Sequence, residues 1–581
     1  MKKEDYLASF CREIIKAGKE MLDLELPKLK EEDFFLFKKT GNRLIYEGEY
    51  FGRRKFLTVF GILAEFIEDD KLGFGREFER KAVFEKLSYI IEEICRERFW
   101  ALPAHVNFDA LDECTIDLFA AETAGTLAEL LYLFHKELKK DTVEMAKGEI
   151  IRRVLKPFCE SDFPYSWWET DRCNWSAVCA GGVGMAAIYM DRLGALPTRW
   201  KEPCLSRVCN AMKCYLGGME EDGACTEGLG YFSYGMSYFT GFAQVLQEET
   251  GIDLLEDSKV HLIATFQQKC YFGHGVSISF SDGSDRECFL PGLTAFLKKH
   301  FEDVELPDFS LARGFEEDAC YRWLTNERNI RWLRKYDTSV TNRKICSREY
   351  LLPSAQWMIA QDEEGNGFAA KGGNNAENHN HNDIGHFLCV FEGEMLLSDL
   401  GAGEYTKDYF SDGRYQILCN RSLGHSVPLI NGAEQPEGKE HCADLFEWNQ
   451  QDRKLTISFA GAYEKGLVDS IQREITFPEH GEKPMLVMLE DRFVCNEKTG
   501  VITESLVTAY QPEPDNQGVT IKGKNGYCRI EGFSSAPTIL PMEHSLHDGR
   551  HVTVYLIHWD LYKSDTNVIN ERLTVSFYKY R

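Results

Sequence analysis

The amino-acid sequence predicts an α+β protein with a helical N-terminal domain and a C-terminal antiparallel β-sandwich domain. The chain has 581 residues, which is longer than a typical single domain, so we expect more than one hydrophobic core. Apolar residues recur at helical spacing up to about residue 335, whereas from about residue 345 they alternate with polar residues. Because the helical pattern precedes the strand pattern, the chain indicates two separate domains and not alternating βαβ units. We place the domains at residues 1–340 and 341–581, with the boundary near the basic segment 331–343.

The helical domain is predicted from apolar stripes and from the punctuation between them. Residues 56–67 and 84–94 each carry apolar side chains at the spacing of one helix face. Segments 119–138, 143–158, 174–194 and 235–251 have helix length and are separated by short Gly, Pro or Asp signals. This part of the chain is therefore a multi-helix array.

The β domain is predicted from a period of two. Segments 455–459, 552–556 and 573–577 alternate apolar and polar residues, which is typical of half-buried strands. Turn signals at residues 392–394, 523–526 and 547–549 join strands at hairpin distances. We therefore expect antiparallel sheets.

Composition excludes several classes of protein. The chain has 67 Lys and Arg against 93 Asp and Glu, a net charge of −26, which argues against nucleic-acid and polybasic membrane-surface binders. No apolar signal sequence and no run of about 18 apolar residues is present. The 19 cysteines are an odd number, lie scattered in apolar runs and form no CxxC pair. This pattern suits buried thiols in a reducing compartment better than a disulfide framework. We expect a cytoplasmic protein with no nucleic-acid or membrane partner.

The segment GGNNAENHNHNDIGHF is the densest group of chemically active side chains. His379 and His381 are two residues apart, so an extended chain would place both rings on one face. A hairpin after this segment brings Asp399 back toward the histidines, and His425 follows in RSLGHSVPLING. Two imidazoles and a carboxylate are a usual donor set for Zn²⁺. We assign His381, Asp399 and His425 to a divalent metal, with Zn²⁺ favoured over Mn²⁺ or Ca²⁺; simple solvated histidines are the alternative.

Two aromatic segments in the helical half are candidates for sugar contact. SWWETDRCNW contains Asn174 beside Trp175, and TEGLGYFSYG contains Tyr231 and Tyr234. Indole faces cover the apolar side of sugars, but any one of these aromatic residues is more often part of a core. In the β half, Arg414, Tyr415 and Arg421 precede His425, and guanidinium groups suit carboxylate or sulfate.

The order of these motifs resembles the heparinase II/III-like polysaccharide lyases. DRCNW, TEGLGYFSYG, NHNHNDIGHF, LLSDLGAGEYT and RSLGHSVPLING follow one another within residues 95–500. The resemblance implies an incomplete (α/α) toroid followed by the β-sandwich. It also implies β-elimination at a uronic acid, in which the C5 proton is removed and the C4–O bond breaks.

The resemblance gives the residues the following roles. Asn174 neutralises the uronate carboxylate, Tyr231 and His379 transfer protons, and Tyr234 is the alternative to Tyr231. The metal bound by His381, Asp399 and His425 is structural. Substrate contacts are expected from His105, Trp175, Tyr234, Arg414, Tyr415 and Arg421.

The predicted function is a lyase acting on an anionic uronate-containing oligosaccharide or polysaccharide, with heparan sulfate, hyaluronan or chondroitin ahead of alginate. Short oligosaccharides suit the net charge of −26, because salt screens charges beyond about 8 Å. A metal-containing glycoside hydrolase that uses a carboxylate pair such as Asp222 and Glu227 is one alternative. A non-catalytic carbohydrate-binding protein is the other.

Overall fold

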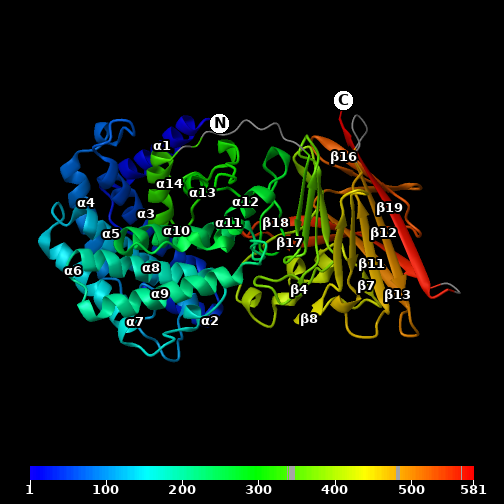
Figure 1. The fold of residues 1–581 in the computed structure, drawn as a ribbon, viewed down its shortest axis with the longest axis horizontal. Helices are drawn as coiled ribbons and strands as arrows, with labels where there is room; N and C mark the ends of the chain where they lie inside the picture. Colours follow the sequence, from blue (N-terminus) through cyan, green and yellow to red (C-terminus); the bar gives the residue numbers. More distant parts are fainter. Residues whose placement is uncertain (337, 339–346, 479–484, 564–565, 581) are drawn as a thin grey trace. The chain divides into compact units, whose positions relative to one another are not determined.

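The computed structural model describes residues 1–336, 338, 347–478, 485–563 and 566–580. The chain forms two compact units. The helical unit comprises residues 1–219, 231–264 and 288–340, and the β unit comprises residues 220–230, 265–287 and 341–581. The predicted fold class, helices followed by antiparallel sheets, is confirmed (Figure 1). The boundary predicted at 340/341 lies outside the described residues, and the segments 220–230 and 265–287 pack with the β unit.

The helical unit follows the predicted apolar stripes closely. Its α-helices are α1 Lys3–Met21, α2 Glu31–Thr40, α3 Leu44–Phe66, α4 Arg80–Cys95, α5 Leu118–Phe134, α6 Lys140–Ile150, α7 Lys156–Glu160, α8 Asn174–Arg192, α9 Thr198–Gly218, α10 Leu229–Thr250, α11 Ser258–Ala264, α13 Pro291–His300 and α14 Trp323–Lys335. The helix predicted over 143–158 is divided into α6 and α7 by a π-helical turn at Ile151–Leu155. Among the described residues, no helix is long and apolar enough to span a membrane.

Small residues let α5 and α8 approach each other closely at the centre of the helical unit. A Cβ atom on Gly182 would lie 2.5 Å from the backbone oxygen of Ala121. Beside this contact, the buried carboxylate of Glu129 accepts hydrogen bonds from Arg328 at 2.7 Å and from Trp323 at 2.8 Å. Glu129 on α5 and these residues of α14 thus fix two helices to each other through a satisfied buried charge.

The β unit consists of antiparallel strands, and the short helix α12 Phe266–Lys269 belongs to it. Its strands are β1 Arg348–Leu352, β2 Trp357–Gln361, β3 Gly367–Lys371, β4 Asn374–Asn375, β5 Phe387–Phe391, β6 Glu394–Leu397, β7 Leu429–Ile430, β8 Gly438–Cys442, β9 Leu445–Asn449, β10 Lys454–Ser458, β11 Ser470–Thr476, β12 Leu486–Val494, β13 Val501–Thr508, β14 Pro512–Asp515, β15 Gly518–Lys522, β16 Gly526–Glu531, β17 Thr538–Ser545, β18 His551–Tyr562 and β19 Val568–Lys579.

The described strands form sheets in the orders β1-β2-β3-β5-β6, β14-β15-β16-β19-β12-β11-β10-β9, β17-β18-β13-β7 and β4-β8. Along β11 every second residue is buried, as the period of two predicts. The inward side chains of the larger sheets share one hydrophobic core. The turns predicted at 392–394, 523–526 and 547–549 join β5 to β6, β15 to β16 and β17 to β18.

A buried arginine connects this core to the loops that carry the candidate site. Arg473 on β11 is fully buried and pairs with Asp491 on β12 at 2.7 Å. Its Nη1 atom donates to the backbone oxygens of Gly385 at 2.9 Å and Ser426 at 2.6 Å. These two residues are the neighbours of His386 and His425, so the sheet fixes the backbone on which both histidines stand.

Candidate functional site

The histidines of NHNHNDIGHF lie on a loop, which we call the histidine loop (residues 376–386), that leads into β5. The sequence predicted an extended segment with His379 and His381 on one face, and this detail is wrong. Residues 376–379 form a turn, His379 has a φ of 58°, and β5 begins only at Phe387. The turn still directs both rings toward one partner, the carboxylate of Asp282.

Asp282 is the centre of a hydrogen-bonded group in the β unit. Its Oδ2 atom accepts from His379 Nδ1 at 2.5 Å and from the Tyr405 hydroxyl at 3.1 Å. Its Oδ1 atom accepts from His381 Nε2 at 3.1 Å and from the Tyr409 hydroxyl. Burial alone would raise the pKa of Asp282, but the hydrogen bonds from His379 and His381 outweigh it and hold that pKa well below its usual range. Asp282 is therefore a buried carboxylate ion.

These contacts fix which nitrogen of each imidazole carries a proton. His381 donates from Nε2 to Asp282, and His425 donates from Nε2 to the backbone oxygen of Cys419 at 2.8 Å. In a neutral ring the other nitrogen then carries a lone pair. The Nδ1 atoms of His381 and His425 are buried and accept no hydrogen bond from the described part of the chain. Two buried lone pairs without a hydrogen-bond donor are what a metal ion would satisfy.

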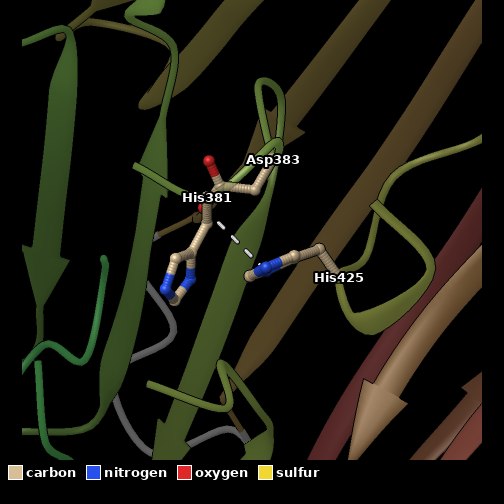
Figure 2. A group of neighbouring side chains, drawn as sticks. All are labelled: His381, Asp383 and His425. Carbon is tan, nitrogen blue, oxygen red and sulfur yellow. Dashed lines mark ion pairs between the residues drawn. The ribbon is translucent and has the colours of Figure 1, made fainter. Parts of the chain in front are cut away.

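Two carboxylates lie beside His425 Nδ1. The Oδ2 atom of Asp399 is 3.7 Å from His425 Nδ1, and Oδ2 of Asp383 is 3.9 Å from the same nitrogen. Figure 2 shows His381, Asp383 and His425 converging from their loops. Two ligands of a tetrahedral Zn²⁺ are roughly 3.4 Å apart, so both carboxylate oxygens lie within a few tenths of an ångström of that separation from His425 Nδ1. These buried His and Asp residues can hold a metal ion.

His386 is a neighbour of this group but its tautomer is unsuited to binding a metal. Its Nδ1 atom accepts the backbone N–H of Ser426 at 2.9 Å, so in a neutral ring Nε2 carries the proton. That Nε2 lies 3.1 Å from Oδ2 of Asp399. His386 therefore orients Asp399, as outer-shell histidines and carboxylates do around metal sites. The sequence predicted that the hairpin of β5 and β6 returns Asp399 toward His379 and His381; in the structure the neighbours of Asp399 are His386 at 3.1 Å and His425 at 3.7 Å.

Burial and the neighbouring imidazoles together keep the candidate ligands in the states that metal binding requires. Burial lowers the pKa of His425 to about 4, so its ring is neutral at pH 7. Burial alone would raise the pKa of Asp399, but the surrounding imidazoles, His386 first, outweigh it and lower that pKa. Neutral imidazole and ionised carboxylate are the ligand forms of both groups.

In the helical unit, three of the predicted residues gather at the start of α8. Asn174 is its first residue and is buried, and Trp175 follows it. The Trp175 ring lies 4.8 Å from the His105 ring and 5.0 Å from the Trp167 ring, measured between centroids. Asp117 holds Nδ1 of His105 at 2.7 Å. Trp167 is 53% exposed, so an indole face is open beside these residues.

Tyr231 and Tyr234 lie in the first two turns of α10, and the surroundings of Tyr234 bear on its role. The Tyr234 hydroxyl donates to the buried carboxylate of Glu122, and the Arg322 guanidinium lies 4.1 Å from the Tyr234 ring centroid. Burial, and then the Glu122 charge, raise the pKa of Tyr234 well above 10. Tyr234 is therefore a poor base, and Tyr231 stays the predicted proton-transfer residue.

The predicted substrate contacts that precede His425 take part in local hydrogen bonds. Arg414 donates through Nε and Nη2 to the backbone oxygen of Asn380 at 3.1 Å and 2.9 Å. Asn380 also donates to the Tyr415 hydroxyl at 3.4 Å, and Arg421 donates to Glu434 at 3.0 Å. The contacts of Arg414 and Tyr415 with Asn380 hold the loop after β6 against the histidine loop. Substrate binding by Arg414, Tyr415 and Arg421 stays a prediction.

The structure does not support Asp222 and Glu227 as the carboxylate pair of a glycoside hydrolase. Asp222 accepts backbone N–H groups of Ser354 at 2.7 Å, Ala355 at 3.1 Å and Ala224 at 3.1 Å. It therefore stabilises local backbone. Glu227 lies near the site instead, with its Oε2 atom 3.8 Å from Nε2 of His379.

Sequence reasoning missed Asp282, Asp383 as a candidate ligand, and Lys371. Asp282 precedes His379 by 97 residues, so no local spacing connects them. Asp383 stands two residues after His381, and that proximity was a usable signal. Lys371 ends the buried strand β3 and lies 2.8 Å from Asp383, which a strand pattern alone does not reveal.

Comparison with known proteins shows the fold. The sequence matches no protein-family model and no curated protein. Solved structures similar to this chain include a mutant of the heparan sulfate lyase HepC from Pedobacter heparinus, with a TM-score of 0.60 and 13% identity over 98% of this chain and 83% of that one. A heparinase III with methylated lysines has a TM-score of 0.61 and 11% identity over 98% and 84%. Another heparinase III has a TM-score of 0.58 and 14% identity over 90% and 77%. The chain therefore has the fold of these heparan sulfate lyases, as the motif order predicted.

Proposed function

We propose that the protein is a polysaccharide lyase that cleaves uronic-acid-containing glycans by β-elimination, with glycosaminoglycans ahead of alginate as substrates. The fold supports this class, because the similar solved structures are heparan sulfate lyases. The observation that carries the proposal is the hydrogen bond that determines which ring nitrogen of His379 carries the proton. Asp282 accepts its Nδ1–H at 2.5 Å, so in the neutral ring Nε2 carries the lone pair of a general base.

The reaction needs three groups because the C5–H of a uronate is a very weak acid. Asn174 donates its side-chain amide to the uronate carboxylate and stabilises the charge that spreads into it. One of His379 and Tyr231 removes the C5 proton, and the electron pair forms the C4–C5 double bond. The C4–O bond breaks, the leaving oxygen receives a proton from the other residue or from the same one, and no water is consumed.

The β unit supports this chemistry with the buried His and Asp group. We propose that His381 and His425, each through Nδ1, and Asp399 hold a divalent metal, with Zn²⁺ favoured. Asp383 is the neighbouring carboxylate: the ligand atoms that lie within 4.8 Å of one another are those of His381, Asp383 and His425, and those of His386, Asp399 and His425. When bound, the ion supplies positive charge that fixes the histidine loop against the loop after β6. His381 then keeps its Nε2–H directed at Asp282.

Ultraviolet absorbance tests the proposal directly. The protein is incubated with oligosaccharides of heparan sulfate, hyaluronan, chondroitin sulfate and alginate, and the absorbance of a conjugated unsaturated uronate is followed. A rise with a glycosaminoglycan is expected and identifies the substrate. New reducing ends without this absorbance would instead support a glycoside hydrolase, and no product from any of the four would favour a carbohydrate-binding protein.

A further inference from the structure

We propose that Asp282 is a positioning residue that holds the base His379 and the metal-binding residue His381 as one unit. This inference rests on the proposed function of His379. Asp282 lies on the segment 265–287 that packs with the β unit, so it approaches the histidine loop from another part of the chain. A residue in that place sets the direction of the His379 ring without touching the substrate.

Each oxygen of the Asp282 carboxylate accepts two hydrogen bonds. A carboxylate offers about four lone-pair positions, two on each oxygen. Oδ2 receives His379 and Tyr405, and Oδ1 receives His381 and Tyr409. The Asp282 side chain is 0% exposed, so water does not compete for these positions. The two imidazoles are therefore held at a fixed distance from each other through one rigid carboxylate.

The backbone around Asp282 is itself fixed. The N–H of Ala402 donates to the oxygen of Gly283 at 3.0 Å, which joins the segment to the loop that follows Asp399. Gly401 has a φ of 60°, and a Cβ atom there would lie 2.4 Å from the same Gly283 oxygen. Only glycine permits this close approach in the left-handed region. Asp282 and Asp399 are thus fixed to one another through neighbouring backbone.

The charge and shape of Asp282 determine the tautomer of His379. A carboxylate accepts Nδ1–H and leaves Nε2 with the lone pair that proton abstraction needs. An asparagine has the same shape, but its NH₂ group would face two of the four present donors and could not accept from them. The His379 ring would then rotate or move its proton to Nε2. Loss of the equivalent carboxylate in a Ser-His-Asp triad costs about 10⁴-fold in kcat for this reason.

The test compares Asp282→Asn with Asp285→Asn, an exposed aspartate on the same segment. Kinetics use the glycan that the absorbance assay identifies. Metal content is measured on each purified protein after equilibration with Zn²⁺. Nitrogen-15 NMR of histidine-labelled protein reports the tautomer, and the signals of His379 are those that disappear in His379→Gln.

We expect Asp282→Asn to lower kcat by about 10²- to 10⁴-fold while KM changes little, because substrate contacts remain. The NMR signals of His379 move from the Nδ1–H to the Nε2–H form, and Zn²⁺ affinity falls by about 10- to 100-fold without being abolished, because Asp282 orients the ligand His381 but does not bind the metal. Asp285→Asn behaves as wild type. Unchanged kcat, or lowered kcat with an unchanged His379 tautomer, would overturn the proposal. Loss of kcat together with Zn²⁺ and no change in tautomer would show that Asp282 serves the metal group alone.

If Asp282→Asn does not fold, the nitrogen-15 spectrum of the wild type provides the test, because Asp282 Oδ2 lies 2.5 Å from His379 Nδ1 and should hold the proton on that nitrogen. We expect the Nδ1–H form of His379, and the Nε2–H form in the wild type would overturn the proposal. If the wild type eliminates none of the four glycans, the proposed function fails. The NMR spectra of wild type and Asp282→Asn then still decide whether Asp282 sets the His379 tautomer.

Discussion

The ammonium group of Lys371 lies 2.8 Å from Oδ1 of Asp383, and both side chains are buried. The Oε2 atom of Glu377 lies 3.8 Å from the same ammonium group. Burial alone would lower the pKa of Lys371, but Asp383 and Glu377 outweigh it and raise that pKa. A permanent cation thus stands beside the candidate metal ligands, and Asp383 is ion-paired whether or not a metal is bound.

Replacing Lys371 with Met is expected to destabilise the β unit strongly. The change leaves the Asp383 carboxylate buried without its cation, and breaking a buried ion pair costs roughly 3–5 kcal/mol. Thermal unfolding measures the loss, with Lys522→Met as control, because Lys522 is an exposed lysine paired with Glu513. Equal melting temperatures for the two variants would show that Asp383 finds another partner.

The metal assignment predicts different effects for three buried histidines. His381→Ala and His425→Ala each remove a proposed ligand and should abolish stoichiometric Zn²⁺ binding. His386→Ala removes only the residue that orients Asp399, so we expect affinity to fall by about 10- to 100-fold. Metal analysis by mass spectrometry after equilibration measures this, and exposed His551→Ala is the control. If His386→Ala abolished binding as completely as His425→Ala, His386 would be a ligand.

Glu377 predicts a pH dependence of stability. Burial raises its pKa to about 7, above the ordinary value of 4.5, and the nearby Lys371 opposes this only in part. The folded state therefore binds more protons than the unfolded state between these two values, so stability falls as the pH rises from about 4.5 through 7. At pH 8 the free energy of unfolding is therefore lower than at pH 4 by roughly 3 kcal/mol on account of Glu377, because each unit of pKa difference corresponds to about 1.36 kcal/mol.

Glutamine does not titrate, so the variant Glu377→Gln should lose this pH dependence of stability. We expect its melting temperature to approach that of wild type at pH 5 and to exceed it at pH 8. Glu363→Gln, at an exposed position nearby, keeps the wild-type profile. Parallel pH profiles for wild type and Glu377→Gln would contradict the assignment.

Local patterns predicted much of the fold and part of the site. The change of apolar period separated helices from strands, because period depends only on neighbouring residues. The hairpin of β5 and β6 was predicted for the same reason, because its turn signal is local. Asp282 could not be predicted, because it precedes His379 by 97 residues and only tertiary packing brings its segment to the histidine loop. The turn at His379 was missed because a positive φ at a non-glycine residue leaves little signal in one sequence.

The tyrosine assignment gives the most direct test of the chemistry. Tyr231→Phe removes the proposed proton-transfer hydroxyl and keeps the ring, so elimination should fall by about 10²- to 10⁴-fold while oligosaccharide binding changes little. Tyr234→Phe is the matched control, because that hydroxyl donates to Glu122 and its raised pKa makes it a poor base. Ultraviolet absorbance measures elimination, and calorimetry with the same oligosaccharide measures binding. Wild-type turnover by Tyr231→Phe, or a larger loss in Tyr234→Phe, would show that another residue transfers the proton.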